Sequence, residues 1–358
     1  MWVVGKTGKK TWGIDWFYNG SAGRAQKGLE ISVIAVVDVK ARQGYTLSVK
    51  QTAVRTEPQQ IDKSTVEAKA KAKAKTKPET ETKAKTKAKG RRKSSPTEPV
   101  VSERVQGYLN QLKTAHKHLT ARVKYLAADS FYSKRFFVDG VRELGLHLVS
   151  KLRIDANLRY LYTGDQKARG ARRKYGDKVD VSDLSKLDFV CQLGTDVKLY
   201  SQVVWHVSLG RKIRIVLLVN HHNPDRPSVA LLFSTDTELD PQQLYLYYKT
   251  RFQIEFIFRD AKQFTGLCDC QSRQEHSLDF HFNASLAALN LAKVEQQQAV
   301  DFDPASTQPL SFSMATHQRL SLNHHLLERF ISMLDLDQTL IKSHPNYPIL
   351  LHYGSLTA

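Results

Sequence analysis

The chain has 358 residues, of which 41% are hydrophobic, so it can bury a sizeable core in one large domain with insertions or in two domains. Its net charge of +19 points to a polyanionic partner. Three cysteines are too few for a disulfide framework, which favours a reducing cytoplasm, and no stretch is apolar and long enough to span a bilayer. These features argue against a disulfide-rich secreted protein and against a membrane protein.

The first 65 residues are expected to supply N-terminal strands of a core. Ile31–Val39 is a continuous run of mostly β-branched residues, which predicts a buried central strand. A turn at Arg42–Gly44 leads into Tyr45–Thr52, a second strand. The two strands should form an antiparallel hairpin.

Residues 66–98 are of low complexity, with Lys alternating with Ala among Pro, Ser and Thr. Such a segment cannot bury apolar surface, which predicts a disordered basic insertion. It is either a solvated linker or a tethered arm that binds DNA phosphates.

Residues 99–153 are expected to hold a β-α-β part of the core. A helix over Val101–Thr120 precedes a strand over Arg122–Ser130 that ends at Asp129. An amphipathic helix over Ser130–Leu144, stopped by Gly145, leads into another strand over 146–153. The short crossover predicts that the two strands are parallel.

Residues 154–240 contain several short strand patterns separated by turn signals, which predicts a β-rich insertion. Its basic stretch Lys167–Lys178 is either a solvated loop or a contact to the DNA backbone. Trp205 in this block is most simply a core residue.

The stretch Tyr245–Phe264 contains no Pro or Gly and is rich in apolar and aromatic residues, which predicts one largely buried helix. Tyr248, Arg251, Glu255 and Lys262 interrupt it at a spacing that places them within about a 60° arc of one helical face. They are either salt links on a solvated face or a site in which Glu255 binds a cation while the other three hold phosphate oxygens.

The rest of the chain is expected to be helical. Residues 241–300 should hold the Glu-bearing helix and a second helix over Asp279–Gln298. Residues 301–358 should form a C-terminal tail with a third helix over Leu326–Leu336 and a Pro-bearing irregular end.

The pattern Y-x2-R-x3-E-x6-K resembles the YREK signature of bacterial insertion-sequence transposases of the DDE class, in the insertion-sequence-four family. The flanking stretches Gly266–Arg273, Asp279–Lys293 and Thr11–Ser32 also resemble this family. The resemblance covers most of the chain, except the Lys-rich segment.

This resemblance implies an α/β fold of the ribonuclease-H-like type, with a mixed sheet flanked by helices and the β-rich insertion before the Glu-bearing helix. Glu255 corresponds to the third catalytic carboxylate, and Ala127–Phe137 is similar to the region of the second, Asp129. Spacing alone favours an ordinary helix N-cap for Asp129. The two acids would hold Mg²⁺, or Mn²⁺ in its place, in a two-metal site. Tyr248, Arg251 and Lys262 would bind DNA phosphate. Some transposases of this class stack a flipped base on a Trp of the β-rich insertion, which is the alternative role for Trp205.

The implied function is cut-and-paste DNA transposition, with strand cleavage and strand transfer at insertion-sequence ends. The implied partners are transposon-end and target DNA and a second copy of the chain, in the nucleoid of the bacterial cytoplasm. The alternatives are a noncatalytic remnant that binds DNA or a partner transposase, and a basic metal-dependent nuclease unrelated to mobile elements.

The first catalytic Asp of the family lies a few residues upstream of the stretch that resembles Gly5–Gly13, and residues 1–14 contain no acid. The resemblance therefore implies truncation at the amino end and a site that binds metal weakly. Asp38, expected inside a strand, and Asp15, expected in a loop, are the possible substitutes. We expect Asp129 and Glu255 to lie about 4 to 8 Å apart, with Asp38 pointing elsewhere.

Overall fold

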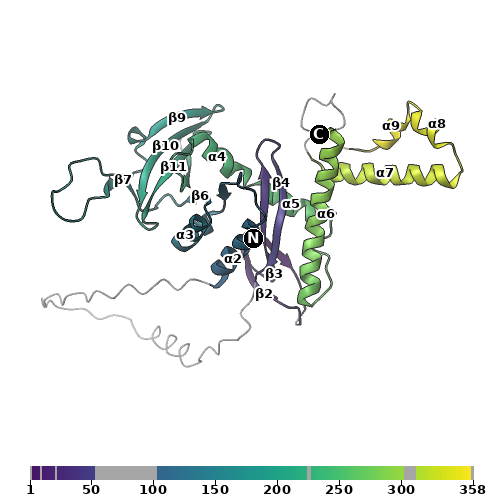
Figure 1. Ribbon diagram of the computed structural model, residues 1–358, viewed down its shortest axis with the longest axis horizontal. Coiled ribbons are helices and arrows are strands. Elements are labelled where there is room, and N and C mark those ends of the chain that lie inside the picture. The colour runs from purple at the N-terminus through teal and green to yellow at the C-terminus, as the bar shows by residue number, and fades with distance from the viewer. Residues whose placement is uncertain are drawn as a thin grey trace, which may run out of the picture.

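The computed structural model describes residues 2–8, 10–20, 22–52, 103–223, 227–301 and 312–355. Its strands form two sheets, and helices lie between and beside them (Figure 1). The long helix α6 (Glu275–Asp301) stands beside the N-terminal sheet, on the side away from the larger sheet. The predicted disordered segment, residues 66–98, lies outside the described residues. No described helix is long and apolar enough to cross a membrane.

The N-terminal sheet is built around one long strand, β3 (Arg24–Asp38). β1 (Trp2–Gly5) pairs with one edge of β3, while β2 (Asp15–Asn19) and β4 (Gln43–Gln51) pair with the other, all antiparallel. The predicted hairpin is therefore confirmed. Asp15 begins β2, so its assignment to a loop is wrong.

The residues of β3 are not buried along the whole predicted central strand. Leu29, Ile31 and Val33 are buried, but Ile34 to Val37 are only half-buried. The reason is that β1 ends beside Ile31, so the edge of β3 beyond that point has no strand next to it among the described residues.

The β-α-β unit forms with the predicted parallel pairing. α2 (Glu103–His116) precedes β5 (Tyr125–Ala127), which pairs in parallel with β6 (His147–Leu152). The single helix expected between them divides into the 3₁₀ turn η1 (Ser130–Tyr132) and α3 (Arg135–Glu143), because Lys134 has extended backbone angles. Gly145, with φ of +77°, ends this segment as expected.

The β-rich block completes an eight-stranded mixed sheet with β5 and β6. Its strand order is β5-β6-β12-β11-β10-β7-β8, with β9 also paired to β10, and every pair except β5–β6 is antiparallel. The strands of the block are β7 (Leu158–Leu161), β8 (Tyr175–Lys178), β9 (Asp188–Leu193), β10 (Val197–His206), β11 (Arg211–Asn220) and β12 (Ser228–Ser234).

The helix expected over Tyr245–Phe264 is interrupted, so the prediction of one continuous helix is wrong. α4 (Pro241–Thr250) ends before Arg251, and α5 (Gln253–Phe264) begins after Phe252. Across the break the backbone N–H groups of residues 251, 252, 254 and 255 donate three residues back instead of four. The cause is tertiary packing: α4 packs on the large sheet, whereas α5 packs on the N-terminal sheet.

The C-terminal part is helical to a greater extent than predicted. α6 packs against β4 and α5, and the Asn290 side chain exchanges two hydrogen bonds with the Thr46 backbone. α7 (Met314–Met333), α8 (Gln338–Ser343) and α9 (Tyr347–Leu351) follow, and they project away from both sheets (Figure 1). The irregular end was a wrong prediction, because Pro348 lies in the first turn of α9, where proline is compatible with a helix.

Candidate active site

Asp129 lies immediately beyond the C-terminal end of β5, where the chain turns into η1. Its carbonyl oxygen accepts hydrogen bonds from the buried Ser150 hydroxyl at 3.0 Å and from the Tyr132 backbone at 3.0 Å. These bonds fix the turn to β6. The Asp129 side chain makes no capping bond to η1, so the N-cap interpretation is wrong and the carboxylate is available for another contact.

Glu255 lies in the first turn of α5, one helical turn after Arg251. Arg251 Nη2 lies 3.2 Å from Glu255 Oε1, and Arg251 Nη1 lies 3.0 Å from Asp129 Oδ1. The guanidinium group therefore bridges the two carboxylates, which are far apart in the sequence. Asp129 Oδ1 and Glu255 Oε1 are therefore separated by no more than the distance between the two Nη atoms plus the two contacts of 3.0 and 3.2 Å.

Solvent reaches the two carboxylates but hardly reaches the group between them. The side chains of Asp129 and Glu255 are 51% and 43% exposed, whereas that of Arg251 is 21% exposed. Arg251 Nε is buried and has no hydrogen-bond partner in the described part of the chain. Solvent can therefore reach the two carboxylates, while the buried Nε–H of Arg251 is a hydrogen-bond donor that no described residue uses.

Tyr248 lies on the other side of Arg251, with the guanidinium carbon 5.6 Å from the centre of its ring. Burial raises the pKa of the Tyr248 phenol above its ordinary value, and the positive charge of Arg251 opposes this shift. The phenol therefore stays protonated at neutral pH and can act as a hydrogen-bond donor.

Lys262 lies two helical turns further along α5 than Glu255, roughly 10 Å along the helix axis. Its ammonium group lies over the ring of Trp2 at 4.0 Å from the centroid, and Trp2 stacks on Phe258 at 5.4 Å. The structure thus brings together Asp129, Tyr248, Arg251 and Glu255, while Lys262 lies apart from them, beside Trp2 of β1.

Neither substitute for the missing carboxylate reaches this cluster. Asp38 is exposed at the end of β3, and its carboxylate accepts hydrogen bonds from the Lys40 and Ala41 backbone at 2.8 and 2.9 Å, as a turn-capping residue does. Asp15 is exposed and accepts from the Trp16 backbone at 2.7 Å. Within the described ranges, no group of three or more His, Cys, Asp or Glu side chains gathers in a way that could hold a metal ion.

The donor set nevertheless suits a hard divalent cation. Mg²⁺ is usually held by one or two carboxylates, and waters and substrate phosphates complete its coordination. Asp129 and Glu255 supply two such carboxylates at one solvent-accessible point, but Arg251 lies between them. A cation that binds both acids must therefore displace the guanidinium group, which could then pair with a phosphate.

Sequence reasoning missed two features of this site. It did not pair Arg251 with Asp129, because the contact joins the α4–α5 break to the turn after β5 and has no local signal. It also gave no role to Trp2, the residue on which Lys262 rests.

Trp205 lies in the β-rich block. Its ring stacks with that of Tyr175, with 6.2 Å between the ring centres, and the Lys174 ammonium group lies 5.5 Å from the centre of the Trp205 ring.

Comparison with known proteins supports an enzyme that acts on nucleic acid. No curated protein matches the chain in a sequence search. The family model described as "Transposase DDE domain" matches residues 97–291, which is more than half of the chain and includes Asp129, Arg251 and Glu255. The chain therefore belongs to the DDE transposase domain family.

Proposed function

We propose that the chain is a cut-and-paste DNA transposase of the insertion-sequence-four type, in which Asp129 and Glu255 are catalytic carboxylates that bind Mg²⁺ or Mn²⁺. The observation that carries this proposal is the shared guanidinium group, which holds two acids from distant elements at one solvent-accessible point. Such a divalent ion would activate the attacking oxygen and stabilise the leaving oxygen of a phosphodiester.

The side chains around the acids have roles that follow from their charge and position. Arg251 holds the two carboxylates in place until a cation and DNA arrive, and then pairs with a phosphate. Tyr248, protonated and half-buried, donates to a phosphate oxygen, and Lys262 binds the backbone further along α5. The net charge of +19 supplies the long-range attraction to DNA.

The division of the chain is part of the same proposal. A ribonuclease-H-like core would comprise residues 1–65, 99–153 and 241–300, with residues 66–98 and 154–240 as insertions and 301–358 as a helical tail. Two copies of the chain would bridge two transposon ends. The YREK signature at Tyr248, Arg251, Glu255 and Lys262 supports the subfamily assignment.

A second candidate function is DNA binding without catalysis, as a remnant of a transposase. It is favoured by the lack of a third acid beside Asp129 and Glu255 among the described residues. It is also favoured by the guanidinium group that already neutralises both carboxylates.

Nicking of supercoiled plasmid in Mg²⁺ or Mn²⁺ separates the two candidates. We expect metal-dependent nicking by the unmodified chain, and its loss in Glu255→Gln and in Asp129→Asn, while plasmid binding in gel shifts stays within about twofold because each change removes a carboxylate rather than a cation. The matched control is Glu143→Gln, an exposed carboxylate at the end of α3. Nicking that persists in both variants would contradict the catalytic assignment, and binding without any nicking would support the second candidate.

A further inference from the structure

Two highly exposed aromatic side chains lie close together on the N-terminal sheet. Trp16 and Tyr18 of β2 are 67% and 69% exposed, whereas Phe17 between them is 7% exposed. Successive side chains of a strand point to opposite faces, so the two exposed rings share one face. Phe17 points to the other face, where the guanidinium carbon of Arg104 in α2 lies 5.9 Å from the centre of its ring. Adjacent apolar rings left in solvent indicate a binding surface rather than part of the core.

β3 supplies the neighbours of these two rings. β2 pairs with the beginning of β3, at the end of the N-terminal sheet opposite the β3–β4 turn (Figure 1). In this register Trp16 lies opposite Lys27, and Tyr18 lies opposite Ala25. Residues directly opposite each other share a face, so the exposed Lys27 side chain leaves the sheet beside the Trp16 ring. We call Trp16, Tyr18, Ala25 and Lys27 the Trp16 surface.

The Trp16 surface and its surroundings are positively charged. Asp15 of β2 precedes Trp16 directly, so its carboxylate points to the opposite face of the sheet. The loop that leads into β2 carries the exposed Lys10, and the Trp12 N–H in this loop donates to the carbonyl oxygen of Arg273 at 2.9 Å. The Arg273 side chain is also exposed. Cations therefore lie beside exposed rings, which is the combination that binds the phosphates and bases of nucleic acid.

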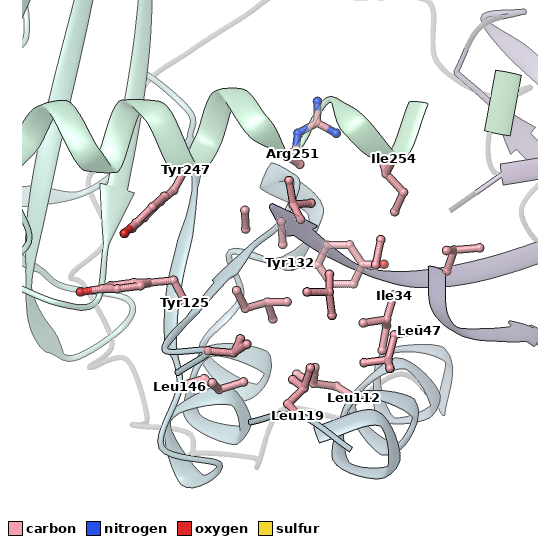
Figure 2. Close-up of a pocket in the computed structure, with 18 of the residues that line it drawn as sticks. Ile34, Leu47, Leu112, Leu119, Tyr125, Tyr132, Leu146, Tyr247, Arg251 and Ile254 are labelled. Atoms are coloured by element: carbon pink, nitrogen blue, oxygen red, sulfur yellow. The ribbon is translucent and has the colours of Figure 1, made fainter. Parts of the chain in front are cut away.

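The Trp16 surface is separate from the candidate active site. Ile34 of β3 and Arg251 line one cavity beside that site (Figure 2). Along β3, the positions of Lys27 and Ile34 are roughly 23 Å apart at about 3.3 Å per residue. A small ligand on the Trp16 surface would therefore reach neither Asp129 nor Glu255, whereas a nucleic acid chain is long enough to reach both places.

We propose that the Trp16 surface binds single-stranded DNA, with bases stacked on Trp16 and Tyr18 and a phosphate bound by Lys27. Side chains two residues apart on a strand are about 6.6 to 6.8 Å apart, and stacked bases are about 3.4 Å apart, so one base can fit between the two rings. Bases in a duplex are already stacked on each other and cannot place their faces against a ring on a sheet. The two rings therefore favour an unpaired strand over a duplex.

The source of the single strand follows from the proposed function, on which this part of the inference rests. Strand cleavage at Asp129 and Glu255 would leave a free strand at the transposon end, and the Trp16 surface would hold that strand away from the carboxylates. The binding itself requires neither a metal ion nor cleavage. The binding test and the nicking test can therefore fail independently of each other.

Fluorescence anisotropy of the full chain with an oligothymidylate of about 12 nucleotides, in chelator, tests the proposal. Trp16→Ala and Tyr18→Ala should each weaken binding at least about fivefold, because each removes a platform for one stacked base. The slope of log K against log salt should stay unchanged in both, because a ring neutralises no phosphate. Lys27→Gln should lower that slope by about 0.7, the value for one phosphate of a single strand. The melting temperatures should change little, since all three side chains are exposed.

The controls separate stacking from other contacts. Trp16→Phe keeps a ring and should bind the oligonucleotide more tightly than Trp16→Ala, while Tyr353→Ala, at a 77% exposed ring beyond α9, should bind as the unmodified chain does. Equal affinities of the two Trp16 variants, or an equal loss in Trp16→Ala on a duplex of the same length, would overturn the proposal. An unchanged affinity in Trp16→Ala would also overturn it, and a lower oligomeric state of that variant in analytical ultracentrifugation would then assign the rings to a contact between copies of the chain.

Discussion

Arg104 and Arg251 each pair with carboxylates, and the surroundings of these two clusters differ. In the first cluster Glu30 of β3 is 2% exposed. It accepts hydrogen bonds from the Tyr108 hydroxyl and the Thr52 hydroxyl, each at 2.6 Å, and it pairs with Arg104 of α2. Every partner donates to the same buried carboxylate, so the cluster fixes α2 on β3 and has no room for a ligand.

In the second cluster the relation is reversed. One guanidinium group, that of Arg251, serves two carboxylates that are about half exposed, and its own Nε lacks a partner among the described residues. A saturated buried carboxylate stabilises the fold, whereas exposed carboxylates that share one counter-ion can exchange it for a ligand. The same residue types thus have a structural role in one cluster and a candidate catalytic role in the other.

The same isosteric substitution in each cluster tests this difference most strongly. Glu30→Gln should lower the free energy of unfolding by about 3 kcal/mol, because it removes the charge from a buried pair and leaves donors facing donors. Glu255→Gln should lower it by less than about 1 kcal/mol, because the pair is partly exposed. Urea denaturation of the two variants measures both values, and equal losses would break the comparison.

Removal of the Arg251 guanidinium group, the counter-ion that both carboxylates share, has the next largest expected effect. Arg251→Gln leaves Asp129 and Glu255 facing each other without a cation between them, so a divalent ion no longer has to displace the guanidinium group. We expect Mg²⁺ to bind about tenfold more tightly, equivalent to about 1.4 kcal/mol. The dependence of the melting temperature on Mg²⁺ concentration measures this change.

Arg259→Gln is the matched control, because Arg259 lies on α5, two helical turns beyond Arg251, but pairs with Asp260. It should leave the Mg²⁺ response as in the unmodified chain. An Arg251→Gln variant with the same response as the control would mean that Arg251 does not compete with a cation at these acids.

Local pattern was enough to predict most of the elements around this site. The β-branched run in β3, the turn at Arg42–Gly44 and Gly145 led to the hairpin and to the parallel β5–β6 pair, both of which the structure contains. The polar stripe predicted over Tyr245–Phe264 identified Arg251 and Glu255 as neighbours, since residues i and i+4 lie close together in a helical segment.

The remaining features depend on contacts that no local pattern encodes. The break after Thr250 has no Pro or Gly, and it arises because α4 and α5 pack on different sheets. The bond from Arg251 to Asp129 and the position of Lys262 over Trp2 join elements far apart in the sequence. Periodicity assigned Lys262 to one helical face but could not tell which ring its ammonium group rests on.

Lys293 is a buried charged residue with a structural role, like those of the Glu30 cluster, and its effect on stability can be tested by changing the pH. Lys293 of α6 is 5% exposed and donates to the Gly44 carbonyl at 2.6 Å, and burial lowers the pKa of its ammonium group to about 8. Because the unfolded chain then binds more protons than the folded chain between about pH 8 and pH 10.5, stability from this group rises with pH in that window.

The free energy of unfolding should therefore rise more steeply over pH 8 to 10 in the unmodified chain than in Lys293→Met, by less than about 1.4 kcal/mol per pH unit. Urea denaturation at three pH values measures the slopes. Lys198→Met, at an exposed position of β10, controls for the loss of one charge. Identical slopes in all three proteins would show that Lys293 is not the source of the pH dependence.

Lys262 gives the smallest effect and decides where the functional surface ends. Its ammonium group over the Trp2 ring contributes about 0.5 to 1 kcal/mol as a cation–π contact, which would be a purely structural role. As a DNA contact it would instead contribute to the salt dependence of binding, because each neutralised phosphate adds about 0.9 to the slope of log K against log salt. Lys262→Gln should therefore reduce that slope by about 0.9, measured by fluorescence anisotropy on duplex DNA, while Trp2→Leu should leave it unchanged because the lysine remains.

Lys342→Gln of α8, where the lysine pairs with Glu328 at 2.7 Å, is the control for a cation outside the site. If the Lys262 and Trp2 variants lose the same stability and neither changes the slope, Lys262 belongs with Arg104 among the structural cations, and the DNA surface ends at Arg251.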